Sequence, residues 1–308
     1  MGGTTTTRSK FKWAKLSSYT PYFFIAPFMT LLLIFNFYPF IFGARISFTD
    51  AQSINPGEFI GFKNYIDILF SNTKFIESII ITFKYAIGAL ITQIPVAFVL
   101  AYVLNNIAKR FRGVLRASFF IPCLINGVVI ALVFRSLFNK EFGVINWILG
   151  LLHLPNQTNW LNDSSLSVFL MVAVSFWQWT GFHMVYFLAN LQSIDPAIYE
   201  VAKLDGASPF RVLWQITVPL MRPAFTFVMV TSAIGALQLF DLPLMLFPNG
   251  TYGPGQAART LVPYIYDFAF AQDFQVGYAS AAGWLVFCII MVISVMQLRF
   301  LGMGNADE

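Results

Sequence analysis

Long runs of apolar residues alternate with short polar segments along the whole chain. Six of these runs approach or exceed the about 20 residues that an α-helix needs to cross the hydrocarbon core of a bilayer. We therefore predict an all-α membrane protein with six transmembrane helices. The predicted spans are residues 21–43, 79–105, 114–137, 165–189, 222–246 and 275–299.

The composition supports a chain that lies in lipid. Hydrophobic residues make up 57% of the 308 residues and charged residues only 11%, whereas about 25% of a soluble domain is charged. The first span is expected to be retained and not cleaved as a signal peptide. It is too long and is interrupted by Pro27 and Pro39, and no A-x-A site follows it.

Lysine and arginine predict the orientation, because they collect in loops that stay in the cytoplasm. With the N-terminus inside, 12 of the 19 basic residues lie on the cytoplasmic side: Arg8, Lys10, Lys12, Lys15, Lys109, Arg110, Arg112, Arg116, Lys203, Arg211, Arg222 and Arg299. The chain then comprises a cytoplasmic tail (1–20), a transmembrane domain (21–299) with a cytoplasmic loop (190–221), and a second cytoplasmic tail (300–308). The net charge of +5 thus reflects topology, and we expect no nucleic-acid partner.

The cytoplasmic loop carries the signals of two short helices. Asp195 followed by Pro196, and Ser208 followed by Pro209, each combine a capping side chain with a proline in the first turn. Gly206 supplies a left-handed stop between them. The expected helices are Ala197–Asp205 and Phe210–Val218, with Pro219 ending the second.

Helices of this length are marginal in water, so something must pack on them. Apolar residues recur at helical spacing in both: Ile198, Val201 and Ala202 in the first, Phe210, Leu213 and Trp214 in the second. The small residues Ala202 and Gly206 would let another backbone approach closely. A well-capped connection that merely joins two spans would show the same signals, and the loop geometry alone leaves both interpretations open.

The spacing of this loop resembles the EAA loop of binding-protein-dependent ABC import permeases. That pattern reads E-A-A, three residues, G, nine residues, I, one residue, L-P. This sequence keeps every spacing with Glu200, Val201, Ala202, Gly206, Ile216, Val218 and Pro219. It departs from the pattern at Val201 and Val218, and Asp205-Gly206-Ala207 matches the longer version of sugar permeases.

The resemblance extends over most of the chain. The segments "PYFFIAPFMTLLLIFNFYPFIFGARISFTD", "FIGFKNYIDIL" and "LQLFDLPLML" are similar to parts of the maltose/glycerol-3-phosphate-type transmembrane subunit. The closing T-x-G-G-P of that family is blurred here to "PNGTYGPG". The resemblance implies the type I ABC importer fold in a prokaryotic cytoplasmic (inner) membrane.

The resemblance also implies a mechanism. The loop would seat in a cytoplasmic ATPase through Glu200, Val201, Ala202, Asp205, Gly206, Ala207, Arg211, Ile216 and Pro219. Two ATPase subunits would bind ATP and Mg, a second homologous permease subunit would complete a heterodimer, and an extracytoplasmic binding protein would deliver a carbohydrate for alternating access. The sequence itself contains no G-x-x-x-x-G-K-[ST] phosphate loop. We therefore expect no enzyme activity and no cofactor in this chain alone.

A sugar path needs aromatic faces for stacking and uncharged hydrogen-bond partners. The fourth and fifth spans, which line the path in this family, supply the candidates Trp177, Gln178, Trp179, Phe182, His183, Tyr186, Ser232, Gly235, Gln238 and Asp241. Trp177 or Trp179 would equally suit packing against the third span. Asp241 is either functional or a helix-end group near outer water, and His183 lacks the neighbours of a metal ligand.

Three other interpretations remain open on the sequence. An ion-coupled secondary transporter would need inverted repeats or paired midplane carboxylates, and only Asp241 comes near. A scaffold subunit would explain the charged loop but not the polar and aromatic lining. A permease for another polar solute is also possible, although an anion would favour a buried basic residue in the path.

Overall fold

The computed structural model describes residues 13–53, 55, 57–107, 109–271 and 274–301. This part of the chain forms helices and turns with only isolated β-bridges, so the predicted all-α class is confirmed. The α-helices are α1 (Trp13–Leu32), α2 (Tyr38–Ile46), α3 (Lys63–Ile66), α4 (Thr73–Asn106), α5 (Lys109–Leu124), α6 (Gly127–Leu137), α7 (Val144–Leu151), α8 (Ser167–Ser193), α9 (Pro196–Leu204), α10 (Pro209–Val212), α11 (Val218–Leu220), α12 (Arg222–Leu237), α13 (Asp241–Leu246), α14 (Leu261–Tyr266) and α15 (Val276–Leu301). Short π-helical segments extend some of them: η1 (Leu33–Phe37), η2 (Asp67–Ser71), η4 (Leu213–Thr217) and η7 (Asp267–Ala271).

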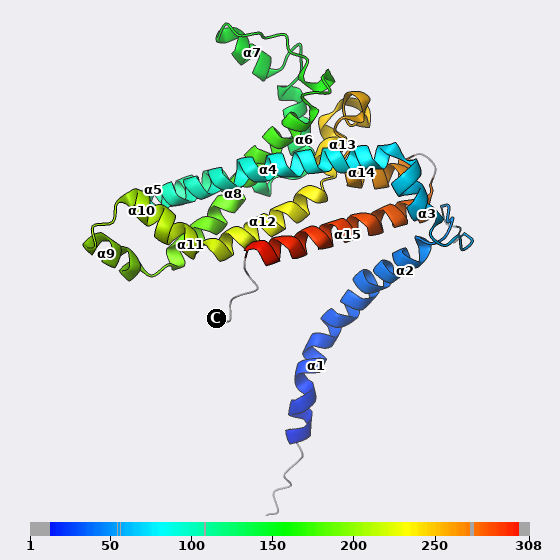
Figure 1. Ribbon diagram of the computed structural model, residues 1–308, viewed down its shortest axis with the longest axis horizontal. Coiled ribbons are helices and arrows are strands. Elements are labelled where there is room, and N and C mark those ends of the chain that lie inside the picture. The colour runs from blue at the N-terminus through cyan, green and yellow to red at the C-terminus, as the bar shows by residue number, and fades with distance from the viewer. Residues whose placement is uncertain (1–12, 54, 56, 108, 272–273, 302–308) are drawn as a thin grey trace, which may run out of the picture.

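Four helices, α4, α8, α12 and α15, run side by side as a bundle, with α5 packed along α8 (Figure 1). Three phenylalanines, one each from α4, α8 and α12, meet inside it. The ring centroid of Phe98 lies 5.8 Å from that of Phe187 and 4.8 Å from that of Phe225. Because aromatic pairs at these separations add to the gain from apolar burial, this cluster fixes the three helices against one another.

The contact between α5 and α8 depends on a glycine. A Cβ atom built on Gly181 would lie only 1.6 Å from the carbonyl oxygen of Phe119. The two helices therefore pack backbone against backbone at this point, as small residues allow in membrane helices.

Four helical stretches are long and apolar enough to cross a membrane on their own. They are Thr20–Ile46, Thr73–Asn106, Ser167–Ser193 and Val276–Phe300. Two bent pairs pass the same test of length and composition, Phe111–Leu124 with Gly127–Leu137 and Pro209–Leu220 with Arg222–Leu237. The described residues thus hold four candidate spans, or six if each bent pair is one span.

The third predicted span, 114–137, is wrong as a single helix. It is divided between α5 and α6, whose axes differ by 95°. Asn126 stands at the break, and its side-chain oxygen accepts a hydrogen bond from the Val128 amide at 2.8 Å. An asparagine N-cap satisfies one of the free amides of a new helix, which is why the chain restarts here.

The fifth predicted span, 222–246, is also broken. Helix α12 ends at Leu237 and α13 begins at Asp241. The hydroxyl of Thr260 donates to the Leu239 carbonyl at 2.8 Å and so satisfies a backbone group that the break releases. A second bend, of 63°, separates Pro209–Leu220 from Arg222–Leu237.

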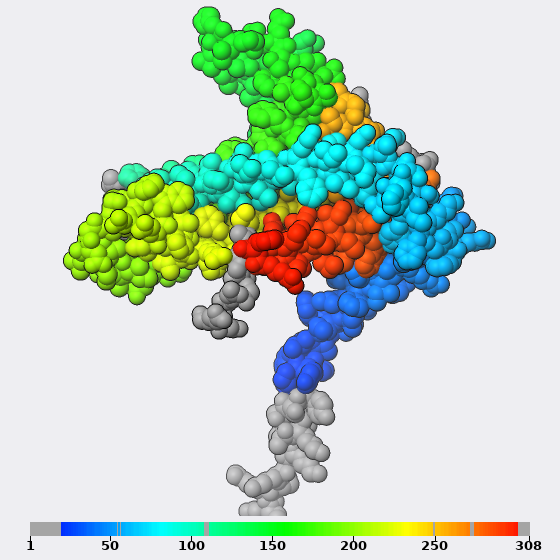
Figure 2. All heavy atoms as spheres, in the orientation of Figure 1, coloured from blue at the N-terminus to red at the C-terminus, as the bar shows by residue number. Residues whose placement is uncertain are grey.

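Two segments leave the bundle. Helix α1 extends away from it on one side, while α2 stays against α15, where the ring centroid of Phe40 lies 4.5 Å from that of Trp284. The arm formed by α6 and α7 projects on another side (Figures 1 and 2). None of the most apolar part of Thr20–Ile46 is buried within the chain. In a bilayer such a surface contacts lipid or another membrane helix.

Candidate functional site

A cavity of about 410 Å³ lies between α4, α8 and the break that separates α12 from α13. Its walls combine aromatic rings with amide, hydroxyl and imidazole groups. Eight of the ten predicted path residues line it: Gln178, Trp179, Phe182, His183, Ser232, Gly235, Gln238 and Asp241. The structure thus brings together side chains that are up to 63 residues apart in the sequence, from Gln178 to Asp241.

The other two predicted path residues point elsewhere. The ring of Trp177 packs edge-on against Phe134 of α6, with 5.4 Å between centroids. The ring of Tyr186 stacks on Phe227 of α12 at 4.7 Å. Residues on one face of α8 thus line the cavity, whereas Trp177 and Tyr186, on other faces, pack against the neighbouring helices α6 and α12.

Sequence reasoning missed the wall supplied by α4. Tyr85, Ala89 and Gln93 line the cavity from this helix. The Gln93 amide donates a hydrogen bond of 3.2 Å to the Ser175 hydroxyl of α8, so two lining residues orient each other. A lone glutamine in the long apolar run of the second span was the available signal, because buried polar groups in membrane helices require partners.

His183 is held by one hydrogen bond within the cavity. Its Nε2 atom lies 3.2 Å from the Ser232 hydroxyl, and its ring is buried. Its Nδ1 atom is also buried and has no hydrogen-bond partner among the described residues. The Ser232–His183 pair therefore keeps one imidazole nitrogen occupied and the other unpaired.

Asp241 lies at the rim of the cavity, where α13 begins. Its side chain is exposed, and the first residue of α6 packs close to it: a Cβ on Gly127 would lie 3.6 Å from the Asp241 Oδ2 atom. Asp241 therefore borders the cavity where the end of α12 and the starts of α13 and α6 come together.

At one end of the bundle, α9 and α10 form a helical hairpin (Figure 1). The predicted caps are present: the Asp195 carboxylate accepts from the Ala197 amide at 2.9 Å, and the Ser208 hydroxyl accepts from the Arg211 amide at 3.3 Å. Gly206 has a φ of +71°, as the predicted left-handed stop requires.

Pro219 does not end the second helix as predicted. The chain passes through the π-helical segment η4 into α11, which continues to Leu220 before the bend. The wider π-turn has different hydrogen bonds, and the Val218 amide bonds to the Leu213 carbonyl. A proline, which lacks a donor, is tolerated just after such a turn.

The predicted coupling residues differ in exposure. Ala202 is 6% exposed and packs within its own chain, so it is not open to another backbone as we expected. The Cβ position of Gly206 meets no atom within 4 Å and remains open. Of the others, Glu200, Val201, Asp205, Arg211 and Pro219 are exposed, and Ala207 and Ile216 are half-buried.

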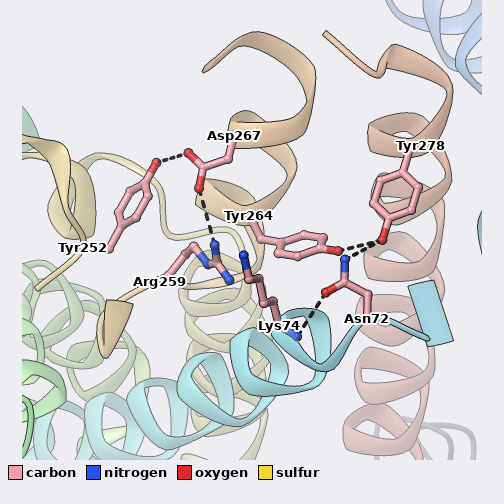
Figure 3. A network of polar contacts seen from close by, with 7 residues as sticks. All are labelled: Asn72, Lys74, Tyr252, Arg259, Tyr264, Asp267 and Tyr278. Carbon is pink, nitrogen blue, oxygen red and sulfur yellow. Dashed lines mark hydrogen bonds and ion pairs between the residues drawn. The ribbon is translucent and has the colours of Figure 1, made fainter. Parts of the chain in front are cut away.

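A buried polar network (Figure 3) lies near α14 and the start of α15, at the opposite end of the bundle from the hairpin (Figure 1). The Arg259 guanidinium and the Asp267 carboxylate are 3.8 Å apart, and both side chains are less than one-tenth exposed. The Tyr252 hydroxyl donates to Asp267 Oδ1 at 2.7 Å. Nearby, the Tyr264 and Tyr278 hydroxyls are 3.0 Å apart, and the Asn72 amide donates to Tyr278 at 2.8 Å.

Arg259, which is not among the cytoplasmic basic residues, is buried within this network. It is 3% exposed, and its guanidinium lies 5.5 Å from the centroid of the Tyr264 ring. Burial raises the pKa of Asp267, while the Tyr252 hydrogen bond and the charges of Arg259 and Lys74 act in the opposite direction. Burial also raises the pKa of Tyr252.

The fold and the site define a class. A multi-helix membrane chain with a polar and aromatic cavity and a capped helical hairpin at one end has the features of a solute permease. The chain belongs to the family described as binding-protein-dependent transport system inner membrane component, which matches residues 93–301. The predicted membership is thus confirmed, and the chain is a multi-pass membrane subunit of a transport system.

Relatives match nearly the whole chain. The arabinooligosaccharides transport system permease protein AraP of Bacillus subtilis (strain 168) is 35% identical over 92% of this chain and 88% of its own. The lactose transport system permease protein LacF of Rhizobium radiobacter is 31% identical over 95% and 97%. The trehalose/maltose transport system permease protein MalF of Thermococcus litoralis is 30% identical over 97% and 98%.

A solved structure shares the fold. It is a chain of a bacterial alginate ABC transporter, in a complex with an alginate pentasaccharide-bound periplasmic protein. The TM-score is 0.83 at 23% sequence identity, over 96% of this chain and 98% of the other. The predicted ABC importer fold is therefore confirmed.

Proposed function

We propose that this chain is a permease subunit of an ATP-driven importer that moves a carbohydrate through the cavity by alternating access. The residues that line the cavity are the main observation in support of this proposal. Tyr85, Trp179 and Phe182 offer rings to the cavity, and the amides and hydroxyls around them suit sugar hydroxyls. The sugars in the names of AraP, LacF and MalF support the same substrate class.

Two tryptophans on α8 provide a matched test. Trp179 lines the cavity, whereas Trp177 packs on Phe134 outside it, and the two are similarly exposed at 40% and 46%. In vesicles with the partner subunits and binding protein, Trp179→Ala should lower the uptake of labelled arabinotriose, maltotriose or lactose by about three- to tenfold, as expected for a lost stacking contact. Trp177→Ala should leave uptake near wild type. Equal losses, or uptake driven by an ion gradient without ATP, would refute the proposal.

The α9–α10 hairpin is the proposed contact with the ATPase subunits, which bind ATP and Mg. Exposed apolar residues of the hairpin and of the adjoining η4 support this role: Val201, Leu204 and Phe210 are 57%, 87% and 73% exposed, and Trp214 of η4 is 56% exposed. Charged Glu200 and Arg211 lie beside them, as at the rim of an interface.

This contact is tested by placing a charge on the hairpin. Leu204→Asp should abolish co-purification with the ATPase subunits, because it puts a charge in the core of the interface. Phe142→Asp, on a similarly exposed residue near α7, should retain it. Membrane insertion is checked for both variants, and retention by the Leu204 variant would contradict the proposed contact.

A second permease subunit is the proposed partner of α1. The outward course of α1 and the absence of burial in its most apolar part support this assignment. A photo-crosslinking residue at Phe28, which is 65% exposed, should yield an adduct with the second permease. The same residue at Val292 of α15, 51% exposed, should yield less. An adduct with lipid alone at Phe28 would count against it.

We further propose that α9 and α10 face the cytoplasm of a prokaryotic cell, as do both termini. The solute-binding protein then docks at the opposite end of the bundle, near α3 and α14. The distribution of lysine and arginine supports this orientation. A cysteine placed at Lys203 should react with an impermeant maleimide only after the membrane is opened, and labelling of intact cells would reverse the topology.

A further inference from the structure

The cavity has one charged wall residue. Among the described residues that line it, Asp241 is the only aspartate or glutamate, and none is lysine or arginine. The remaining polar groups are the amides of Gln93, Gln178 and Gln238, hydroxyls, and the imidazole of His183. A molecule in the cavity therefore meets a negative charge that no described lining residue compensates with a positive one.

The Asp241 carboxylate is not engaged by the protein. Its side chain is exposed, and no hydrogen bond or ion pair joins it to another described residue. Its backbone position is nevertheless defined, because the Thr260 hydroxyl bonds to the carbonyl of Leu239, two residues earlier. Gly127 closes one side of the site. The backbone that leads to Asp241 is thus held in place, and the carboxylate is available to a ligand.

We propose that Asp241 is a specificity-determining residue, through which the cavity accepts neutral saccharides and rejects anionic, uronate-type saccharides. The inference rests on the proposed function and adds the charge of the substrate to it. A carboxylate accepts hydrogen bonds from two neighbouring sugar hydroxyls, but it repels another carboxylate. The repulsion is less screened in a cavity than in bulk water.

The size of the effect follows from the charge alone. At an intermediate dielectric, a like charge about 8 Å away changes affinity by about tenfold. Asp241→Asn removes the charge while keeping the shape. The variant loses one acceptor for a neutral sugar and no longer repels an anionic one. The affinity for a neutral saccharide divided by the affinity for an anionic one should therefore be about tenfold or more lower in the variant than in the wild type.

The test measures binding to the assembled transporter in lipid nanodiscs without the binding protein, so that the selectivity of that protein does not enter. Isothermal titration calorimetry compares arabinotriose, with maltotriose and lactose as further neutral probes, against trigalacturonate. The matched control is Glu77→Gln. Glu77 is an exposed carboxylate of α4 that does not line the cavity.

The wild type and the Glu77 variant should bind a neutral probe and bind trigalacturonate at least about tenfold more weakly. The Asp241 variant should lose most of that preference. If wild type binds trigalacturonate as well as a neutral probe, or if Asp241→Asn leaves the ratio unchanged, the inference is overturned while saccharide import stands. If no saccharide of either kind binds, the proposed function itself fails.

Discussion

The buried Arg259–Asp267 pair allows a sharp prediction about stability. Asp267→Asn keeps the volume of the side chain and an oxygen that can accept from Tyr252, but it leaves Arg259 without its counter-charge. The guanidinium cannot reach water, because Arg259 is 3% exposed and the surrounding residues are closely packed. The substitution should therefore destabilise the protein through the unpaired charge.

Its magnitude can be bounded from the geometry. Removing one partner of a buried ion pair costs about 3–5 kcal/mol. The pair here is long, at 3.8 Å, and the Arg259 Nε atom has no hydrogen-bond partner among the described residues. We therefore expect the lower end, about 3 kcal/mol. Arg259→Met should cost a similar amount, because it leaves the Asp267 carboxylate buried and unpaired.

The assay is a double-mutant cycle on purified protein in detergent, with the midpoint of thermal unfolding followed by intrinsic fluorescence. Each single variant should unfold several degrees below wild type, and the double variant should recover most of the loss, since neither buried charge remains. Glu141→Gln, an exposed carboxylate, serves as the control and should change little. Two near-neutral single variants, or a double variant whose loss equals the sum of the singles, would refute the reasoning.

Two further predictions concern other parts of the chain. Gly206→Ala should destabilise the folded hairpin by about 1–2 kcal/mol, because φ is +71° at this position. Stimulation of ATP hydrolysis by the loaded binding protein should fall, while insertion into the membrane is unchanged. Gly206→Asn should have a smaller effect on both the stability and the stimulation. Gly181→Ala should force α5 away from α8, because its Cβ would overlap the Phe119 carbonyl. We expect the substitution to destabilise the protein by about 1–3 kcal/mol or more, measured as a lower midpoint of thermal unfolding. A midpoint equal to that of the wild type would show that the contact between the two helices is looser than described.

The sequence predicted the features that depend on local chemistry. The caps at Asp195 and Ser208 and the left-handed Gly206 were all visible, because each feature is set by a few adjacent residues. The same rules, applied within the apolar runs, would have found the breaks. Asn126 before Gly127, and Asp241 followed by Pro243, are helix-start signals, but hydropathy alone treats them as parts of longer spans.

The features that depend on distant partners were out of reach. The burial of Arg259 requires Asp267 and Tyr252 to close around it, and no local pattern distinguishes it from an exposed loop arginine. The Tyr85–Gln93 wall of the cavity is likewise set by the packing of α4 against α8. The direction of each tryptophan on α8 follows from which helix lies opposite, so Trp177 and Trp179 were equivalent in the sequence and are not in the structure.

The cavity and the proposed docking surfaces lie on different parts of the chain. The cavity is built on α4, α8 and the α12–α13 break, whereas α1 and the α9–α10 hairpin contribute no residue to it. Substitutions in the cavity thus leave the partner-facing residues untouched. If the hairpin docks on an ATPase as proposed, gene duplication followed by changes at a few wall positions would yield permeases with new cargo that still engage the same ATPase. Such modularity would allow one energising subunit to serve several importers in the same cell.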